Sequence, residues 1–199
     1  MGIAMGMKKR NRNEPVLLNV QAGLNKPEFR GHETVRPTPD ILDALERDYP
    51  LEASIADLID NSIDAGARNV LIRFMRSRQR LLSLCIADDG RGMDDAELRR
   101  AMQFAARRSY GDMDLGMFGV GLKTASLSQA EQLIVVSHSK GNSAAGRRWT
   151  KAGIKKHDWR LDVLKSGSAR QLLEHNWGGL GAIGRGTLVR WDHVYDFDR

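Results

Sequence analysis

The apolar positions within residues 51–66 repeat at helical spacing, directly after a proline. This pattern predicts a helix that begins after Pro50, ends at Gly66 and lays one face on a core. The side chains expected on that face are Leu51, Ile55, Leu58, Ile59 and Ser62.

The opposite side of this predicted helix carries acidic and amide side chains. Asp57, Asp60, Asn61 and Asp64 project from it, and Asp57 and Asn61 lie one turn apart. A solvated acidic face is one interpretation. However, the segment holds no Lys or Arg to neutralise the acids, and Asp and Asn are poor formers of a helix interior. The second interpretation is a magnesium-binding site, because hard cations prefer oxygen ligands.

Strand patterns follow this helix. Val70–Met75 and Leu81–Ala87 are rich in β-formers and flank a basic turn, which predicts a hairpin or adjacent strands. Leu133–Ser137 is almost unbroken in its apolar character and predicts a central strand. Further helices are predicted at 41–47, at 94–106 and from the Gly119–Ser126 segment to about residue 129. Further strands are predicted at 146–152, 160–164 and 187–191, and residues 165–186 are predicted to be a loop around a weak helix.

The first part of the chain lacks such patterns. Residues 1–35 are predicted to be a basic flexible arm, either a disordered tail or a strap across a partner. Residues 36–199 are predicted to form one domain, because a chain of 199 residues with 41% hydrophobic residues can build a single core.

Composition adds constraints on partners and compartment. The net charge of +6 favours contact with polyanions such as nucleic acid. The basic run from Arg147 to Lys156 is either a solvated face or a nucleic-acid-binding patch. The single cysteine, Cys85, excludes an internal disulfide and indicates a reducing compartment. No apolar run can span a bilayer and the basic start lacks a signal-peptide core, so we expect no membrane partner. The expected location is cytoplasmic, or nuclear in a eukaryote.

A first glycine-rich segment follows the second strand of the hairpin. In Asp88-Asp89-Gly90-Arg91-Gly92-Met93, the glycines permit backbone conformations that a side chain forbids, and they let the chain approach a flat ligand. Asp88 can accept a hydrogen bond from an exocyclic amine such as that of adenine. An ordinary acidic turn is the alternative interpretation.

A second glycine-rich segment opens a predicted helix. Gly119–Ser126 offers backbone N–H groups to phosphate oxygens, and Lys123 adds a positive charge. It does not match the Walker A pattern. Residues 107–118 precede it without a clear period, which is typical of either a lid over a ligand or a plain surface loop.

In this order and spacing, the motifs resemble those of the GHKL superfamily of ATP-binding domains, which includes DNA gyrase B, heat-shock chaperones, histidine kinases and MutL-type mismatch-repair ATPases. The resemblance covers about residues 51–191. Its motifs here are Asp57-x-x-x-Asn61, Asp88-x-Gly90-x-Gly92, Gly116-x-x-Gly119-x-Gly121-x-Lys123 and Gly186-Thr187. Within the superfamily, LIDNSIDAGA and GVGLKTAS are most similar to the MutL and microrchidia (MORC) branch.

The resemblance implies an α/β (α+β) two-layer sandwich of the Bergerat type, with a mixed sheet and helices on one face. ATP and Mg²⁺ would lie between the layers. Asp57 would be the catalytic base, Asn61 would ligate Mg²⁺, and Asp88 would contact the adenine amine. Thr187 would support the adenine end, and Lys123 would hold phosphate. The other implied nucleotide contacts are Gly90, Gly92, Met93, Gly116, Phe118, Gly119, Val120, Gly121 and Leu122.

The chain departs from the family pattern at Asp57, where the hydrolytic branch usually has the longer glutamate. A general base must come within hydrogen-bonding reach of its proton donor, so we expect slow hydrolysis. Histidine kinases usually carry Asn there, which makes a histidine kinase core the weakest alternative. We expect lid closure and homodimerisation on ATP, acting on DNA or a protein. A nucleotide sensor without turnover is the main alternative.

Gyrase- and MutL-like enzymes carry a further domain whose lysine reaches the γ-phosphate. The present chain ends soon after the last motif. We therefore expect that this lysine comes from a further segment or from a partner. The alternative is that the domain mainly binds nucleotide.

Overall fold

A computed structural model describes residues 27–35, 50–77, 80–103, 121–177 and 184–195. The strands are β1 (Phe29–Thr34), β2 (Val70–Ser77), β3 (Arg80–Asp88), β4 (Ala130–His138), β5 (Ala145–Thr150), β6 (Arg160–Leu164) and β7 (Gly186–Val194). The helices are α2 (Leu51–Asp64), α3 (Asp95–Met102), α4 (Gly121–Gln129), α5 (Lys151–Lys156) and α6 (Ser166–Trp177). The helix expected at 41–47 lies outside the described residues.

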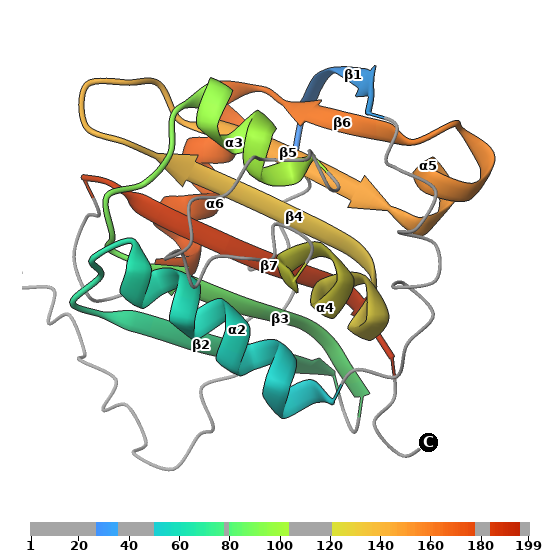
Figure 1. Cartoon of the computed structure of the whole chain (residues 1–199), viewed down its shortest axis with the longest axis horizontal. Coiled ribbons are helices and arrows are strands. Elements are labelled where there is room, and N and C mark those ends of the chain that lie inside the picture. Colours follow the sequence, from blue (N-terminus) through green and yellow to red (C-terminus); the bar gives the residue numbers. More distant parts are fainter. Residues whose placement is uncertain (1–26, 36–49, 78–79, 104–120, 178–183, 196–199) are drawn as a thin grey trace, which may run out of the picture.

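The strands form one seven-stranded sheet in the order β1-β6-β5-β4-β7-β3-β2 (Figure 1). The α/β class is therefore confirmed, and β4 is central, as its apolar run predicted. The expected mixed sheet is wrong for the described residues, where every strand pairing is antiparallel. The reason is that β7 inserts between β3 and β4 and runs antiparallel to both.

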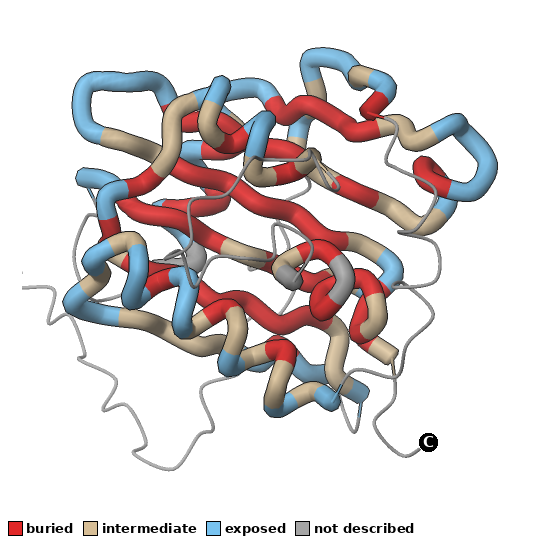
Figure 2. Tube along the Cα trace, viewed as in Figure 1, coloured by how far each residue is buried: buried red, intermediate tan, exposed pale blue. Residues whose placement is uncertain are grey.

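Helices cover both faces of the sheet, and not one face as expected. In Figure 1, α2, α3 and α4 lie in front of the sheet and α6 lies behind it. Alternation along the strands explains this arrangement, because successive side chains point to opposite faces. On β4, Leu133 and Val135 join the core under α2, α3 and α4, whereas Ile134 and Val136 join the core under α6. Figure 2 shows the result, with buried strands inside exposed outer helix surfaces.

Helix α2 follows its predicted pattern closely. Leu58 and Ser62 are buried, while Asp60 and Asn61 are exposed. Ser54 is also buried, and its backbone N–H and its hydroxyl both donate to the carbonyl oxygen of Pro50. The helix ends at Asp64, two residues before Gly66, which adopts a φ of +70° that side chains rarely allow.

Helix α3 has Asp94 as its N-cap, within the helix predicted at 94–106, and packs on β5. The Asp94 carboxylate accepts from the Glu97 backbone N–H, and the Glu97 side chain accepts from the Asp94 backbone N–H. This reciprocal capping box satisfies two backbone donors at the start of the helix. The helix ends at Met102, earlier than the residue 106 expected from the pattern.

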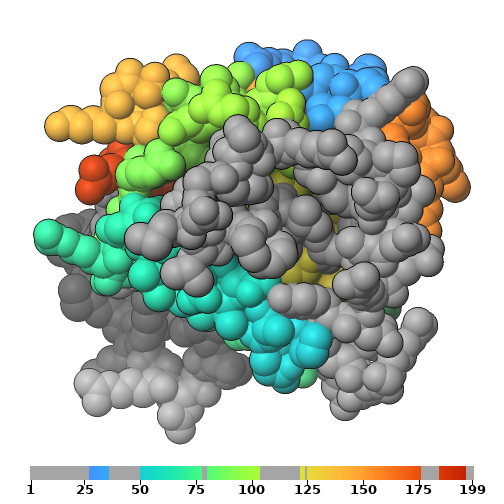
Figure 3. Space-filling model, in the orientation of Figure 1, coloured from blue at the N-terminus to red at the C-terminus, as the bar shows by residue number. Residues whose placement is uncertain are grey.

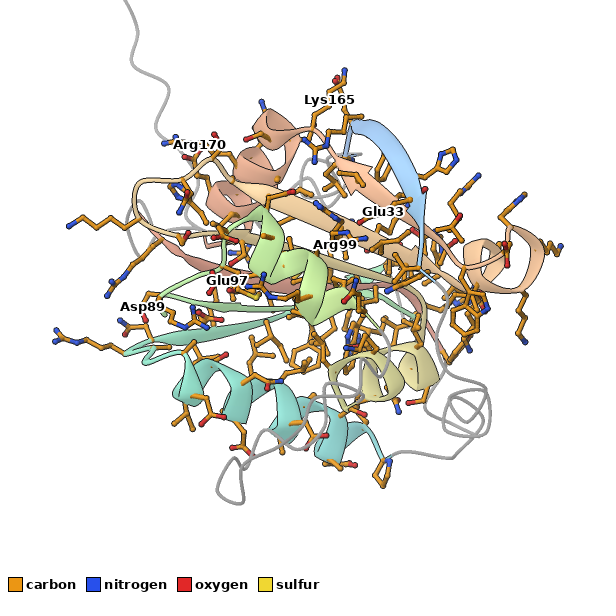
Figure 4. All side chains as sticks on the ribbon, turned by 45° about the horizontal axis from the view of Figure 1, so that its top comes forward. Glu33, Asp89, Glu97, Arg99, Lys165 and Arg170 are labelled. Atoms are coloured by element: carbon orange, nitrogen blue, oxygen red, sulfur yellow. The ribbon has the colours of Figure 1, made fainter. Side chains whose placement is uncertain are left out.

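The predicted arm through residue 35 is wrong for residues 29–34, which form the edge strand β1 on β6. Side chains distant in sequence hold this strand, so its own pattern gave no signal. The Arg148 guanidinium lies 4.1 Å from the centre of the Phe29 ring. Glu33 points toward Arg99 of α3 across a 2.8 Å ion pair (Figure 4). Figure 3 shows β1 in blue and α3 in light green as neighbours on this face.

The basic run of residues 147–156 is largely committed to internal contacts. Arg147 is 2% exposed and pairs with Glu33 and Asp95. Arg148 pairs with Asp162 at 2.7 Å. The predicted nucleic-acid patch is therefore reduced mainly to the exposed lysines of α5, because an ion-paired buried arginine has no charge to offer a partner. Within the described ranges, no helix is long and apolar enough to cross a membrane.

Candidate nucleotide-binding site

Asp88 ends β3 as a buried carboxylate beneath α2. Asp88 is only 6% exposed, and its Oδ1 accepts a hydrogen bond from the Gly90 N–H at 2.9 Å. The Ser62 hydroxyl of α2 lies 3.4 Å from Oδ2 and 3.1 Å from the Leu58 carbonyl oxygen, so its single proton is shared between these two acceptors. Burial raises the pKa of Asp88, although these hydrogen bonds oppose the rise. The carboxylate thus lies between the end of β3 and the helix that carries Asp57 and Asn61.

The glycines after Asp88 are required by close packing against neighbouring residues of the protein itself. A Cβ at Gly90 would lie 2.8 Å from the Cβ of Ala65, at the end of α2. A Cβ at Gly92, where φ is +67°, would lie 2.1 Å from the carbonyl oxygen of His138. From the sequence, these glycines were predicted to let the chain approach a flat ligand. In the structure they also allow this loop to fit between α2 and β4.

Thr187 lies beside Asp88 in the sheet. The two residues pair in the register of β3 and β7, and Thr187 also pairs with Ser137 of β4. The Ser137 hydroxyl lies 2.8 Å from the Thr187 hydroxyl and accepts from the Met93 N–H at 2.8 Å. The structure therefore brings together Asp88, Met93 and Thr187, three of the residues that the family resemblance implied as nucleotide contacts.

Ser62 and Ser137 are the residues that the sequence argument missed. Ser62 was assigned only to the apolar face of its helix, although it is the one polar member of that face. Ser137 ends the apolar run that begins at Leu133 and is fully buried. A lone hydroxyl in a buried apolar run must find hydrogen-bond partners, so that position was a usable signal.

Asp57 and Asn61 lie one turn apart on α2, as predicted. Asp57 is half-buried and Asn61 is exposed. Asn61 directly precedes Ser62, so the helix turn that carries it also contacts Asp88. The described residues contain no cluster of three His, Cys, Asp or Glu side chains suited to a metal. An amide oxygen on an exposed turn is compatible with Mg²⁺, which usually keeps several waters and is shared with substrate phosphates.

Lys123 is the residue whose environment differs most from its expected role. It is 1% exposed, and its Nζ donates to the carbonyl oxygens of Ala101 and Gln103 at 2.7 and 2.9 Å. Burial lowers the pKa of Lys123 to about 8. The ammonium group therefore caps the last carbonyls of α3, where positive charge is favourable. A contact with phosphate stays a prediction.

The rest of the second glycine-rich segment is described in part. Gly121 begins α4, and Leu122 packs against the core beneath α2 and α3. Helix α4 packs on α2, where the Ser54 hydroxyl lies 3.5 Å from the carbonyl oxygen of Ala125. The expected lid, residues 107–118, and Gly116, Phe118, Gly119 and Val120 lie outside the described residues.

Comparison with known families agrees with this architecture. The family described as histidine kinase-, DNA gyrase B-, and HSP90-like ATPase matches residues 49–178. The chain therefore belongs to this family of ATPases, the GHKL superfamily, and its sheet with covering helices is the ATP-binding fold of that family. Within the superfamily, it falls in the MORC and MutL-like branch.

Relatives in this branch come from plants, animals and bacteria. Protein MICRORCHIDIA 6 of Arabidopsis thaliana is 34% identical over 95 residues, which are 45% of this chain and 14% of the relative. ATPase MORC2 of Homo sapiens is 33% identical over 90 residues, 43% of this chain and 9% of the relative. DNA mismatch repair protein MutL of Rhodospirillum rubrum is 30% identical over 125 residues, 58% of this chain and 19% of the relative. The chain thus matches only a small part of these longer proteins.

Proposed function

We propose that this domain binds ATP together with Mg²⁺ and hydrolyses it slowly to ADP and phosphate. The observation that carries the proposal is the meeting of a buried carboxylate, Asp88, with the Thr187 hydroxyl and the helix that carries Asp57 and Asn61. Membership of an ATPase family supports the same substrate.

Asp88 is suited to the adenine end of the nucleotide. A desolvated carboxylate is costly unless donors satisfy it, and the exocyclic amine of adenine is such a donor. The Gly90 N–H donates to Asp88 Oδ1, and the Ser62 hydroxyl lies 3.4 Å from Oδ2, so these two contacts orient the carboxylate. In the proposal, Asp88 reads the amine, and the loop from Gly90 to Met93 lies against the base.

Asn61 and Asp57 are assigned to the phosphate end. The Asn61 amide oxygen would be the protein ligand of Mg²⁺, which would offset charge on the phosphate oxygens. Asp57 would act as the general base that orients the attacking water. The backbone N–H groups of Gly119 and of Gly121, the first residue of α4, would hold phosphate oxygens. The shorter Asp57 side chain is the reason to expect slow turnover.

We further propose that ATP orders residues 107–118 as a lid and brings two copies of the domain together. Hydrolysis would then time the release of a clamp on DNA, with a protein partner as the alternative. The net charge of +6 supports contact with a polyanion. One relative is named as a DNA mismatch repair protein, which supports nucleic acid as the partner class.

Substitutions on α2 test the catalytic assignment. Asp57→Asn is expected to lower ATP turnover about a hundredfold or more while ATP still binds, because only the proton acceptor is lost. Asn61→Ala is expected to abolish the dependence of ATP binding on Mg²⁺. Asp60→Asn is the matched control, because it removes an exposed acid from the same helix and leaves turnover unchanged. Equal turnover in all these proteins would refute the assignment.

A nucleotide sensor without turnover is the second candidate, and the short side chain of Asp57 favours it. This candidate predicts saturable ATP binding that Asp88→Asn weakens, with no phosphate release when partners are added. Titration calorimetry with ATP and Mg²⁺, followed by a phosphate-release assay on the same sample, separates the two functions.

A further inference from the structure

Three neighbouring strands present a row of polar side chains toward α2. Ser137 of β4, Thr187 of β7 and Asp88 of β3 are direct cross-strand partners. Directly paired residues point to the same face of a sheet and lie within contact distance. This face is the one covered by α2, because Val135 and Ile86, two residues before Ser137 and Asp88, join the core beneath that helix. The row therefore connects the centre of the sheet with the proposed adenine-reading carboxylate.

The partners of the Ser137 hydroxyl determine where its single proton goes. Its oxygen lies 3.0 Å from the Gly186 carbonyl, 2.8 Å from the Met93 nitrogen and 2.8 Å from the Thr187 hydroxyl. The carbonyl can only accept and the backbone N–H can only donate. Ser137 therefore gives its proton to Gly186 and accepts from Met93. Only an acceptor site then remains for Thr187.

The Thr187 hydroxyl must consequently donate its own proton to Ser137. A hydroxyl has one proton and two lone pairs. Once that proton points at Ser137, Thr187 offers only lone pairs to any other group. This direction is fixed by buried atoms alone, because Ser137 is fully buried and Thr187 is 9% exposed.

We propose that Ser137 is a positioning residue that sets base selectivity by holding Thr187 as a pure hydrogen-bond acceptor beside Asp88. The inference rests on the proposed ATP site. Two neighbouring acceptors favour a base edge with an exocyclic amine, as in adenine. They disfavour a carbonyl at the same position, as in hypoxanthine or guanine, because two acceptors would face each other without a proton.

Binding of ATP and of inosine triphosphate by the whole chain tests the inference, with titration calorimetry as the readout. Wild type is expected to prefer ATP. Ser137→Ala frees the Thr187 proton, so the preference is expected to fall about three- to tenfold, through weaker ATP binding and equal or tighter inosine triphosphate binding. Ser137→Thr keeps the hydroxyl and is expected to restore the wild-type preference.

Ser83→Ala is the matched control. Ser83 is equally buried, and its hydroxyl donates to the Trp191 carbonyl at 2.7 Å in the same sheet. This variant is expected to lose a similar amount of stability with no change in the preference for ATP. A drop in preference that is equal in Ser83→Ala and Ser137→Ala would reduce Ser137 to a structural role and overturn the inference.

The outcomes separate the inference from the function on which it rests. If wild type binds ATP selectively and Ser137→Ala keeps the full preference, the inference alone is overturned. If wild type binds neither nucleotide, the proposed function is overturned and the inference with it. Should Ser137→Ala not fold, Thr187→Val removes the same acceptor and must show the same loss of preference, while an unchanged preference there overturns the inference.

Discussion

Replacing Lys123 by methionine removes a buried ammonium group and keeps a side chain of similar length. The Lys123 Nζ donates to the Ala101 and Gln103 carbonyls, just at the end of α3. These bonds join α3 to the first turn of α4. Since α3 follows the loop after Asp88, and α4 follows the second glycine motif, this substitution loosens the connection between the two ends of the proposed site.

Two opposing contributions set the expected change at neutral pH. Each carbonyl left without a donor costs about 1–3 kcal/mol. Burial of the charged amine lowers the Lys123 pKa from 10.5 to about 8, which corresponds to a destabilisation of about 3 kcal/mol. The methionine variant has no charge to bury, so it avoids this destabilisation. At pH 7 the two contributions nearly cancel, and we expect a net loss of about 1 kcal/mol.

The pH dependence of stability separates the lost hydrogen bonds from the cost of burying the charge, because only the second contribution changes with pH. Folding lowers the Lys123 pKa to about 8, so between about pH 8 and pH 10.5 the unfolded chain binds the proton more tightly than the folded chain. Wild type therefore gains stability as pH rises through this window, by about 1.4 kcal/mol per pH unit at most. The neutral amine still has two N–H groups for the two carbonyls. Lys123→Met has no such gain.

Urea unfolding at pH 7, 8, 9 and 10 measures the difference in the free energy of unfolding between wild type and Lys123→Met. We expect this difference to grow by about 2–3 kcal/mol from pH 7 to pH 10. Lys140→Met is the control, because Lys140 is exposed in the turn after β4, and its difference should stay flat. A Lys123→Met difference that is constant across this range would refute the reasoning.

Two further substitutions test the end of β3 and the loop that follows it. Asp88→Asn is expected to weaken ATP binding about tenfold or more, through the lost charge-assisted acceptor. The same variant should unfold at higher temperature without nucleotide at pH 8, because the folded Asp88 has a raised pKa and its ionised form is disfavoured. That gain should fade as the pH falls toward 4, whereas a gain independent of pH would contradict the argument. Gly92→Ala should lower the free energy of unfolding by more than about 1 kcal/mol, since its Cβ would lie 2.1 Å from the His138 carbonyl oxygen. Gly167→Ala, in α6 with open space around it, should instead raise it by about 0.4–1 kcal/mol in the same urea assay, and equal effects at both glycines would refute the packing argument.

Sequence periodicity was a reliable guide wherever the partner of an element lay in the pattern itself. The α2 helix was predictable because its apolar face recurs within a single segment. The β2–β3 hairpin was predictable because its turn is short. The central position of β4 followed from an apolar run that must be covered on both faces, which α2, α3 and α4 on one side and α6 on the other supply. The one-turn spacing of Asp57 and Asn61 on α2 and the place of Asp88 at the end of β3 were predictable because each motif is local.

Elements held by distant side chains were not predictable. Strand β1 has little apolar alternation and is fixed by Arg99, Arg147 and Arg148, which lie more than sixty residues away in the chain. The charge of Arg147 was visible, but its burial against Glu33 was not. For the same reason, the contacts of the Lys123 ammonium group with the Ala101 and Gln103 carbonyls at the end of α3 could not be predicted from the sequence.

The sequence by itself determined the family, the α/β class and the order of the motifs, because these depend on residue types at fixed local spacing. Only the tertiary structure decided which polar groups face one another: Ser62 against Asp88, Ser137 against Thr187, and Lys123 against the end of α3. The physical reason is that a hydrogen bond depends on distance and direction in space, and strand order and helix packing set both of them over separations that no local pattern encodes.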